Sequence, residues 1–258
     1  MSDFDNAAFK YDKQFSYTCI GEAQRNLVWR YIEKLDLHHH GNLLEINCGT
    51  GEDAKRWKGQ NKKVHATDVS PKMIETARLK FPDIAFDVID ILALSKNQKK
   101  IGQPDLIFSN FGGLNCLSPN ELNNFFCDSA DLLSPNGKLI LVIMGKKCLW
   151  DKLFLIIKGR ANERNRRNAN SFLAVNVDGM NVKTWYYSPK EIEGMAKAHF
   201  AIEDLKPIGL FVPPSYLATY FSSKKRTLAF LQYLDRIFLF RFFANYADHY
   251  FIVLKKIG

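Results

Sequence analysis

The sequence contains little cysteine and no long uncharged apolar run, and it lacks the features of several protein classes. Its five cysteines are an odd number, scattered without the spacing of metal ligands, so neither a disulfide framework nor a metal site is expected. The opening residues, MSDFDNAAFKYDKQF, have neither the basic nor the apolar region of a signal peptide. These absences predict reduced thiols, a cytoplasmic location and no bound metal.

Acidic residues are fewer than basic ones, with 27 Asp and Glu against 36 Lys and Arg, which gives a formal charge of +9. Basic residues gather in three runs, at 96–100, 160–167 and 224–226. Such runs are usually a solvated face, but they leave open an anionic substrate, an acidic carrier protein or peripheral contact with a membrane. The sequence has no zinc finger, aromatic-interleaved basic stripe or recognised RNA-binding motif, so no nucleic-acid partner is expected.

One stretch, residues 43–57 (LLEINCGTGEDAKRW), has the pattern of a ligand-binding turn between a strand and a helix. Its apolar start predicts a short buried strand, Gly49 and Gly51 predict a turn with little side-chain bulk, and residues from Glu52 onward predict a helix. Such a turn leaves backbone N–H groups unpaired at the helix start, beside a gap where a ligand can touch the main chain. Glu45 precedes the glycines, and its carboxylate suits a cationic ligand and repels a pyrophosphate.

The run Glu45-Ile-Asn-Cys-Gly-Thr-Gly51 resembles the first motif of the class I S-adenosylmethionine-dependent methyltransferases, an acid followed by Gly-x-Gly. The resemblance implies S-adenosylmethionine as cofactor and an α/β, Rossmann-like fold: a seven-stranded, mostly parallel sheet with helices on both faces. It also implies cofactor contacts from the turn and the helix start, which we assign to Glu45, Asn47, Cys48, Gly49, Thr50, Gly51 and Asp53. Two alternatives stay open: a dinucleotide fold, because Gly49-x-Gly51-x-x-Ala54 satisfies its degenerate fingerprint, and a glycine turn without a ligand.

A second motif lies at the end of the next predicted strand, residues 64–67. Asp68-Val-Ser-Pro-Lys-Met73 resembles the family's second motif, with serine and proline at a helix start. The resemblance implies that Asp68 accepts hydrogen bonds from both ribose hydroxyls. It also implies that Val69 and Met73 flank the adenine, although core packing explains Met73 at least equally well.

A third predicted strand, residues 84–88, precedes Asp90 and Ile91. In the family an acid at this place accepts the adenine amino hydrogen, and the next backbone N–H meets a ring nitrogen. The resemblance therefore assigns these roles to Asp90 and Ile91, with Asp87 as the fallback because strand ends are uncertain by a few residues.

The loop after the fourth predicted strand, residues 105–108, collects polar, aromatic and glycine residues where open α/β sheets bind ligands. The resemblance implies that this loop faces the methionine part of the cofactor and the methyl acceptor, with contacts from Asn110 and Phe111. The loop lacks the Asn/Asp-Pro-Pro-Tyr/Phe sequence of many nucleic-acid and protein amide methylases. That difference argues against N-methylation of adenine, cytosine or glutamine.

The N-terminal residues precede an amphipathic helix expected at 21–37. In similar methyltransferases this segment folds over the cofactor, so the resemblance makes Tyr11 and Phe15 candidate lid contacts. Arg25 would reach the cofactor's carboxylate if the helix began at the cleft, but a surface arginine is the simpler interpretation.

The chain is predicted to form one domain, with an N-terminal lid and helix (1–40), a cofactor-binding core (41–145), an insertion (146–187) and a C-terminal part (188–258). The insertion contains a predicted hairpin through Asp178-Gly179. The C-terminal part contains predicted strands at 201–208 and 249–254, the last antiparallel, around an aromatic segment at 211–243. In that segment Phe230, Leu234, Phe238 and Phe242 recur at helical spacing, which indicates core or dimer burial, a hydrophobic acceptor, or a membrane.

These patterns predict a methyltransferase acting on a small or lipid-like hydrophobic acceptor at oxygen or carbon. Methyl transfer needs chiefly alignment of donor and acceptor, so no triad or metal is required. O-methylation of a phenol would benefit from a base, for which His199 and His249 are candidates, but no catalytic residue is assigned. A nicotinamide-dependent oxidoreductase and a catalytically silent methyltransferase-like subunit are the alternatives, and oligomerisation is left open.

Overall fold

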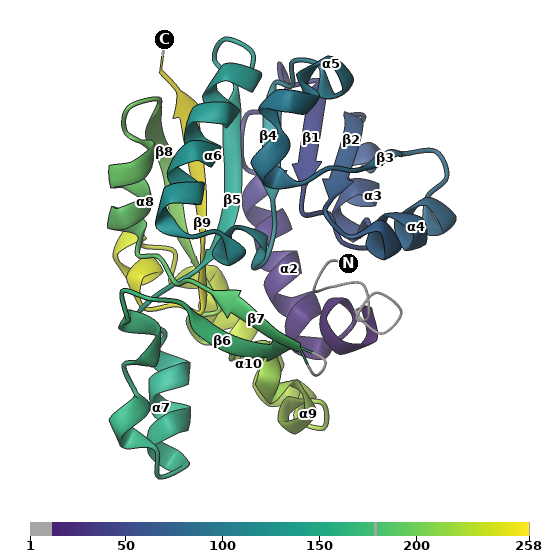
Figure 1. Cartoon of the computed structure of the whole chain (residues 1–258). Helices are drawn as coiled ribbons and strands as arrows, with labels where there is room; N and C mark the ends of the chain where they lie inside the picture. The colour runs from purple at the N-terminus through teal and green to yellow at the C-terminus, as the bar shows by residue number, and fades with distance from the viewer. Residues whose placement is uncertain (1–11, 178–179, 258) are drawn as a thin grey trace.

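The computed structural model describes residues 12–177 and 180–257, and a seven-stranded sheet lies at its centre (Figure 1). The strand order is β3-β2-β1-β4-β5-β9-β8, with β1 to β5 parallel and β9 antiparallel to both of its neighbours. The strands span Asn42–Ile46 (β1), Lys63–Asp68 (β2), Ala85–Val88 (β3), Leu106–Ser109 (β4), Lys138–Met144 (β5), Phe200–Ile208 (β8) and His249–Lys256 (β9). This arrangement confirms the predicted α/β fold, including the antiparallel last strand.

The sheet is covered on both faces, because its central strands are apolar on both sides. In β5, Leu139 and Leu141 belong to one hydrophobic cluster, whereas Ile140 and Val142 belong to the other. Successive side chains of a strand point to opposite faces, so a continuous apolar run such as LILVI supplies both layers of core at once. The sequence signature of a buried parallel strand is therefore realised here.

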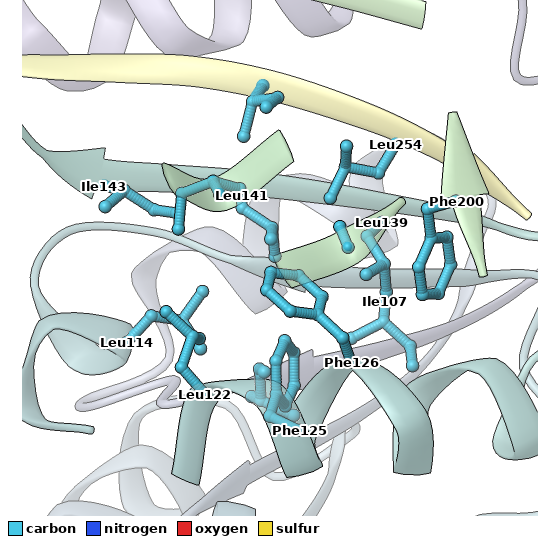
Figure 2. Close-up of a cluster of buried hydrophobic side chains, with 14 of the residues drawn as sticks. Ile107, Leu114, Leu122, Phe125, Phe126, Leu139, Leu141, Ile143, Phe200 and Leu254 are labelled. Atoms are coloured by element: carbon cyan, nitrogen blue, oxygen red, sulfur yellow. The ribbon is translucent and has the colours of Figure 1, made fainter. Parts of the chain in front are cut away.

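Helices form a layer on each side of the sheet. Phe125 and Phe126 of α6 pack against β5 on one face, with Phe200 and Leu254 beside them (Figure 2). Trp57 of α3 belongs to the cluster on the other face. The helices span Cys19–Ile32 (α2), Glu52–Gly59 (α3), Pro71–Lys80 (α4), Gln98–Ile101 (α5), Pro119–Leu132 (α6) and Pro189–Ala196 (α8). Of these, α6 and α8 cover one face, and α2, α3 and α4 cover the other.

Three helices begin with the same Ser-Pro pair. Ser70, Ser118 and Ser188 each occupy the position before the helix, and each hydroxyl oxygen accepts a hydrogen bond from a backbone N–H in the first turn. The proline that follows has no N–H to leave unpaired, and its fixed φ suits the first helical position. These starts were predictable from the sequence at residues 70 and 188.

A further group of elements lies beyond the carboxyl ends of the parallel strands, in the lower part of Figure 1. It comprises α7 (Leu149–Ile157), the antiparallel hairpin of β6 (Leu173–Val177) and β7 (Met180–Thr184), α9 (Ala218–Phe221) and α10 (Lys225–Ile237). The hairpin is confirmed, although its turn residues 178–179 lie outside the described part. No helix in the described ranges combines the length and apolar character needed to cross a bilayer.

Two helix predictions are wrong at their ends. The helix predicted at 21–37 runs from Cys19 to Ile32, because the chain then turns and brings Leu37 into the core. The helical spacing of Phe230, Leu234, Phe238 and Phe242 is realised only in its first half: α10 stops at Ile237, and Phe238 packs edge-on against Phe211 and Phe243. Tertiary packing of these rings outweighs the helical spacing of the apolar residues.

Short helical turns complete the connections. They span Asp12–Ser16 (η1), Ile91–Ala93 (η2), Ser95–Asn97 (η3), Gly113–Cys116 (η4), Ala161–Glu163 (η5), Arg166–Asn168 (η6), Ser215–Leu217 (η7) and Arg241–Asn245 (η8). Of these, η1 bears directly on the candidate site.

Candidate functional site

The turn between β1 and α3 has a backbone that only small or unusual residues adopt. Asn47, Gly49 and Gly51 all have positive φ, at 55°, 53° and 83°. A Cβ added at Gly51 would lie 2.8 Å from Cζ of Phe86, closer than real contacts allow. The turn therefore needs glycine at position 51 for both its conformation and its space.

A pocket opens on this turn at the carboxyl edge of the sheet, where β1 and β4 end. Most of its lining comes from the turn and from the start of α3, and β1, α2, η1 and the loop after β4 supply the rest. Its lining residues are Ser16, Arg25, Glu45, Asn47, Cys48, Gly49, Thr50, Glu52, Asp53, Asn110 and Phe111. The predicted contacts Glu45, Asn47, Cys48, Gly49, Thr50, Asp53, Asn110 and Phe111 are thus brought together in one pocket.

Two buried acids form the floor of the pocket. Asp53 accepts hydrogen bonds from Trp29 Nε1 at 2.7 Å and from Asn110 Nδ2 at 2.9 Å. Glu45 is only 2% exposed, and its Oε2 has no hydrogen-bond partner among the described residues. Burial raises the pKa of Glu45 well above its usual range and the charge of Asp53 adds to this, whereas Arg25 opposes it. A buried acceptor without a donor is what a cationic or N–H-bearing ligand would satisfy.

Arg25 lies in the pocket, and its interpretation as a surface arginine is wrong. Its Nε lies 3.4 Å from Oδ1 of Asp53, and its guanidinium lies over the ring of Phe111 with Cζ 5.9 Å from the centroid. The helix begins at Cys19 and is capped by the hydroxyl of Thr18, so the second turn of α2 reaches the pocket. The pocket consequently presents a cation beside its two acids.

Asp68 binds the glycine turn from the end of β2. Its Oδ2 accepts the backbone N–H of Gly49 at 2.9 Å, and its Oδ1 accepts that of Ser70 at 2.9 Å. The carboxylate thus connects the turn to the start of α4. Each carboxylate oxygen can accept more than one hydrogen bond.

The residues assigned to the adenine lie outside the lining of this pocket. Val69 is exposed and Met73 is buried, with its N–H bonded to Ser70 Oγ at 3.2 Å. Asp90 is exposed and accepts the N–H of Leu92 at 2.9 Å.

Two further placements concern the same end of the sheet. Ile91 is buried. Asp87, the fallback for the adenine contact, is bound by His65 at 2.8 Å and by Lys100 at 2.7 Å on the side of β3. Those ion pairs engage its carboxylate within the fold.

The described N-terminal residues lie on the glycine turn. Asp12 accepts a hydrogen bond from Thr50 Oγ1 at 2.6 Å and pairs with Lys80 Nζ at 2.7 Å. Tyr17 donates its hydroxyl to Glu52 Oε1 at 2.7 Å, and Lys80 also pairs with Glu52. Burial alone would raise the pKa of Asp12, but the hydrogen bonds from Lys80 and Thr50 outweigh it and lower the pKa.

The segment predicted to form a lid therefore contacts the glycine turn and the start of α3. Phe15 is half-buried in η1, and the next residue, Ser16, lines the pocket. Tyr11 lies outside the described residues. Ser16 and Glu52 were not predicted as lining; the position of Glu52, directly after the glycine turn, was the signal that could have found it.

The two histidine candidates lie at opposite ends of the strands, one at the amino end and one at the carboxyl end of the parallel sheet. His199 precedes β8, at the amino end of the parallel strands, where its Nε2 lies 3.5 Å from Cys127 Sγ. His249 pairs with Met144 at the carboxyl end of β5, and its ring packs edge-on against Phe111 with centroids 5.2 Å apart. Its Nδ1 lies 3.1 Å from Asp248 Oδ2. Of the two, His249 is therefore beside the pocket.

Comparison with known proteins agrees with this geometry. A family described as "Methyltransferase domain" matches residues 43–137. Malonyl-[acyl-carrier protein] O-methyltransferase 1 of Ilyobacter polytropus is 36% identical over 148 residues, 53% of this chain and 50% of the relative. Malonyl-[acyl-carrier protein] O-methyltransferase of Serratia marcescens is 33% identical over 63 residues, 24% of this chain and 25% of the relative. The chain spans half the length of the first relative and a quarter of the second.

Solved structures share the whole fold. An S-adenosylmethionine-dependent methyltransferase from Clostridium acetobutylicum superposes with a TM-score of 0.61 at 16% identity, over 100% of both chains. N-methyltransferase NodS from Bradyrhizobium japonicum, in complex with S-adenosylhomocysteine, gives 0.53 at 12% identity over 93% of this chain and 88% of that chain. The chain therefore shares the fold of S-adenosylmethionine-dependent methyltransferases, and its residues 43–137 match a methyltransferase domain.

The pocket has the chemistry that the methyltransferase cofactor requires. S-adenosylmethionine carries an ammonium and a sulfonium as cations and one carboxylate. The pocket supplies a buried carboxylate oxygen without a donor on Glu45, a guanidinium on Arg25 and main chain without side-chain bulk at Gly49. The residues present therefore fit S-adenosylmethionine.

Proposed function

We propose that this protein transfers a methyl group from S-adenosylmethionine to an oxygen of a small or lipid-like hydrophobic acceptor. The observation that carries the proposal is the buried, unpartnered Oε2 of Glu45 in the same pocket as Arg25. The adjacent acid, Glu45, and cation, Arg25, match the ammonium and the carboxylate of the methionine part of the cofactor. A charge-assisted hydrogen bond to a buried carboxylate is among the stronger interactions available to such a ligand.

The following roles are part of the proposal. Glu45 and Asp53 hold the amino group, Arg25 binds the carboxylate, and Asp68 accepts hydrogen bonds from the ribose. The remaining predicted contacts support the ligand around these anchors: Asn47, Cys48, Gly49, Thr50 and Gly51 on the turn, Val69, Met73, Asp90 and Ile91 at the adenine, and Asn110, Phe111 and Phe15 over the methionine part.

The protein contributes to the reaction mainly by aligning the methyl donor with the acceptor and by excluding water. When bound, the cofactor supplies an electrophilic methyl group on its sulfonium sulfur, and the neutral thioether that remains after transfer is a good leaving group. The ring of Phe111 contacts the guanidinium of Arg25 and the ring of His249. It lines the side of the pocket where the acceptor would approach. Holding two reactants in line can supply about 7 to 11 kcal/mol of the barrier.

Oxygen is proposed as the attacking atom for two reasons. The relatives that match this chain are named O-methyltransferases of malonyl-[acyl-carrier protein], and the loop at Asn110 and Phe111 lacks the sequence of amide methylases. A carboxylate acceptor is ionised at neutral pH and needs no base. A phenol would need one, and His249, beside Asp248 and Phe111, is the residue in place for it.

Two rival functions have less support. A nicotinamide dinucleotide would bring its diphosphate against the buried acids Glu45 and Asp53, which would repel it. A catalytically silent subunit would bind the cofactor in the same way and differ only in turnover. Both rivals can be separated from the proposal by measurement.

Calorimetry with S-adenosylmethionine and S-adenosylhomocysteine is the first test. Binding of both ligands, weakened in Glu45→Gln and in Arg25→Gln, is expected, and no binding of either at high micromolar concentration would overturn the proposal. A fluorescence titration with NADH tests the dinucleotide rival. Transfer of labelled methyl to a panel of fatty acids, malonyl thioesters, phenols and cell-extract lipids then separates an enzyme from a silent subunit.

A further inference from the structure

Helix α7 turns its apolar face outward. Four residues at the helical spacing i, i+4, i+7 and i+8 are exposed, and Ile157 reaches 73% exposure. These are Leu149, Leu153, Ile156 and Ile157. An ordinary surface helix would carry its charged residues on this face.

The opposite face of α7 is fixed by polar contacts. Asp151 is buried and accepts two hydrogen bonds from Arg166, at 2.6 and 3.0 Å, and one from Tyr216 at 3.1 Å. Trp150 donates its indole N–H to the carbonyl of Phe211 at 2.9 Å. A helix held in this way cannot roll its leucines and isoleucines inward without leaving a buried acid unpaired.

Helix α10 repeats the arrangement. Phe230, Tyr233 and Ile237 share one exposed face, whereas Asp235 is buried and accepts the backbone N–H groups of residues 211 and 212 at 2.7 and 3.1 Å. Beyond its end, Phe240 is 70% exposed. Both helices lie beyond the carboxyl end of the sheet (Figure 1), and neither lines the cofactor pocket.

The edges of both faces are basic. Residues 152–167 contain six Lys and Arg with Glu163 as the only acid, although Arg166 and Arg167 among them pair with Asp151 and Asp248. Residues 224–241 contain five Lys and Arg with the buried Asp235 as the only acid. Lys158, Arg164, Lys225 and Arg241 are exposed. A second copy of this chain on a two-fold axis would bring these like charges together, whereas an anionic surface complements them.

We propose that α7 and α10 form a binding surface for an anionic lipid bilayer. Leucine, isoleucine and phenylalanine side chains enter the boundary between headgroups and acyl chains, and the lysines and arginines at the edges pair with lipid phosphates. The protein then lies on the membrane without crossing it. This surface is separate from the cofactor pocket, so it can be tested without cofactor or acceptor.

Sedimentation with phosphatidylcholine vesicles, with and without phosphatidylglycerol, tests the proposal. The protein is expected to sediment with the anionic vesicles, and Ile156→Ser/Ile157→Ser should weaken this partition about tenfold or more, since two large apolar side chains lose their burial. Leu79→Ser is the matched control, because Leu79 is 80% exposed on α4, away from both helices. It should bind like the wild type.

Charge reversal gives an independent readout. Lys158→Glu should weaken binding to anionic vesicles several-fold, whereas Lys99→Glu, exposed on α5 at the far end of the molecule, should not. Far-ultraviolet circular dichroism verifies folding. If the isoleucine variant unfolds, Phe230→Ser/Tyr233→Ser provides the same test on α10.

Three results would overturn the proposal. The first is no sedimentation with phosphatidylglycerol vesicles. The second is unchanged binding in a folded Ile156→Ser/Ile157→Ser protein. The third is a dimer that this variant abolishes while the wild type ignores vesicles, which would assign the face to a second copy.

Discussion

The backbone N–H of Gly49 donates to Oδ2 of Asp68 at 2.9 Å, which joins the glycine turn after β1 to the end of β2. The same carboxylate accepts the N–H of Ser70. One side chain therefore holds two ligand-facing segments in register, in addition to the proposed contact with the ribose.

Replacing Asp68 tests both roles. Asp68→Ala should weaken S-adenosylmethionine binding by about ten- to a hundredfold, since hydrogen bonds to a charged group contribute about 1.5 to 3 kcal/mol. It should also lower stability, because two backbone donors lose their acceptor. Asp68→Asn, which keeps one oxygen, should recover part of both, and calorimetry with thermal melting measures them. Unchanged affinity in Asp68→Ala would mean that the ribose lies elsewhere.

Glu45 should make the cofactor-free protein less stable as pH rises. Its pKa is raised in the folded state, so the native protein holds the proton more tightly than the unfolded chain does. Stability is therefore lost as pH rises from about 4.3, the ordinary value, toward the folded one. Glu45→Gln should remove this loss and raise the free energy of unfolding at pH 8 by about 1 to 3 kcal/mol. It should also weaken cofactor binding.

Thermal melting across pH, with and without S-adenosylmethionine, is the measurement for Glu45. Glu193→Gln, which changes an exposed acid on α8, is the control and should leave the pH profile of the wild type unchanged. A Glu45→Gln protein that melts like the wild type at pH 8 would contradict the prediction.

Asp248 should be a major anchor of the C-terminal half. It pairs with buried Arg167 at 2.9 Å, and although burial would raise its pKa, the charges of His249 and Arg167 hold that pKa far below its usual range. Its stabilisation is present above pH 4 and is lost as pH falls. Asp248→Asn should destabilise the protein by about 3 to 5 kcal/mol at pH 7, because buried Arg167 loses its nearer charge partner and keeps only the longer contact with Asp151, at 3.4 Å.

Denaturant unfolding of the Asp248→Asn protein measures that loss. The difference from the wild type should shrink below pH 4, where Asp248 gains its proton in the unfolded wild-type chain while it stays ionised in the native protein. A constant difference across pH would show that the loss is steric and not electrostatic.

Lys80 should control the N-terminal segment. It pairs with both Asp12 and Glu52, so Lys80→Ala leaves two acids facing each other without their cation. Trypsin cleavage after Lys13, which is exposed, should become faster, and Lys99→Ala should not have this effect. Limited proteolysis followed by mass spectrometry gives the rates, and equal rates in the two variants would place the restraint elsewhere.

The sheet and the glycine turn could be predicted because their signals are local. Apolar runs such as LILVI, the Ser-Pro helix starts and the Gly-x-Gly turn each determine their own backbone. The position of Arg25 could not be predicted in this way, because periodicity gives the buried face of α2 but not which pocket its second turn meets. The outward leucines of α7 were hidden for a similar reason, since apolar spacing alone does not tell inside from outside, and the deciding contact of Asp151 with Arg166 depends on the tertiary fold.

Trp29 gives the protein an optical probe of its own. Its indole N–H is held by Asp53 on the pocket floor, and its ring lies 4.8 Å from that of Trp57, centroid to centroid. A ligand that forms a hydrogen bond or ion pair with Asp53 must alter the polarity around the indoles of Trp29 and Trp57. Intrinsic emission therefore reports occupancy of the site in real time, without any label attached to the chain.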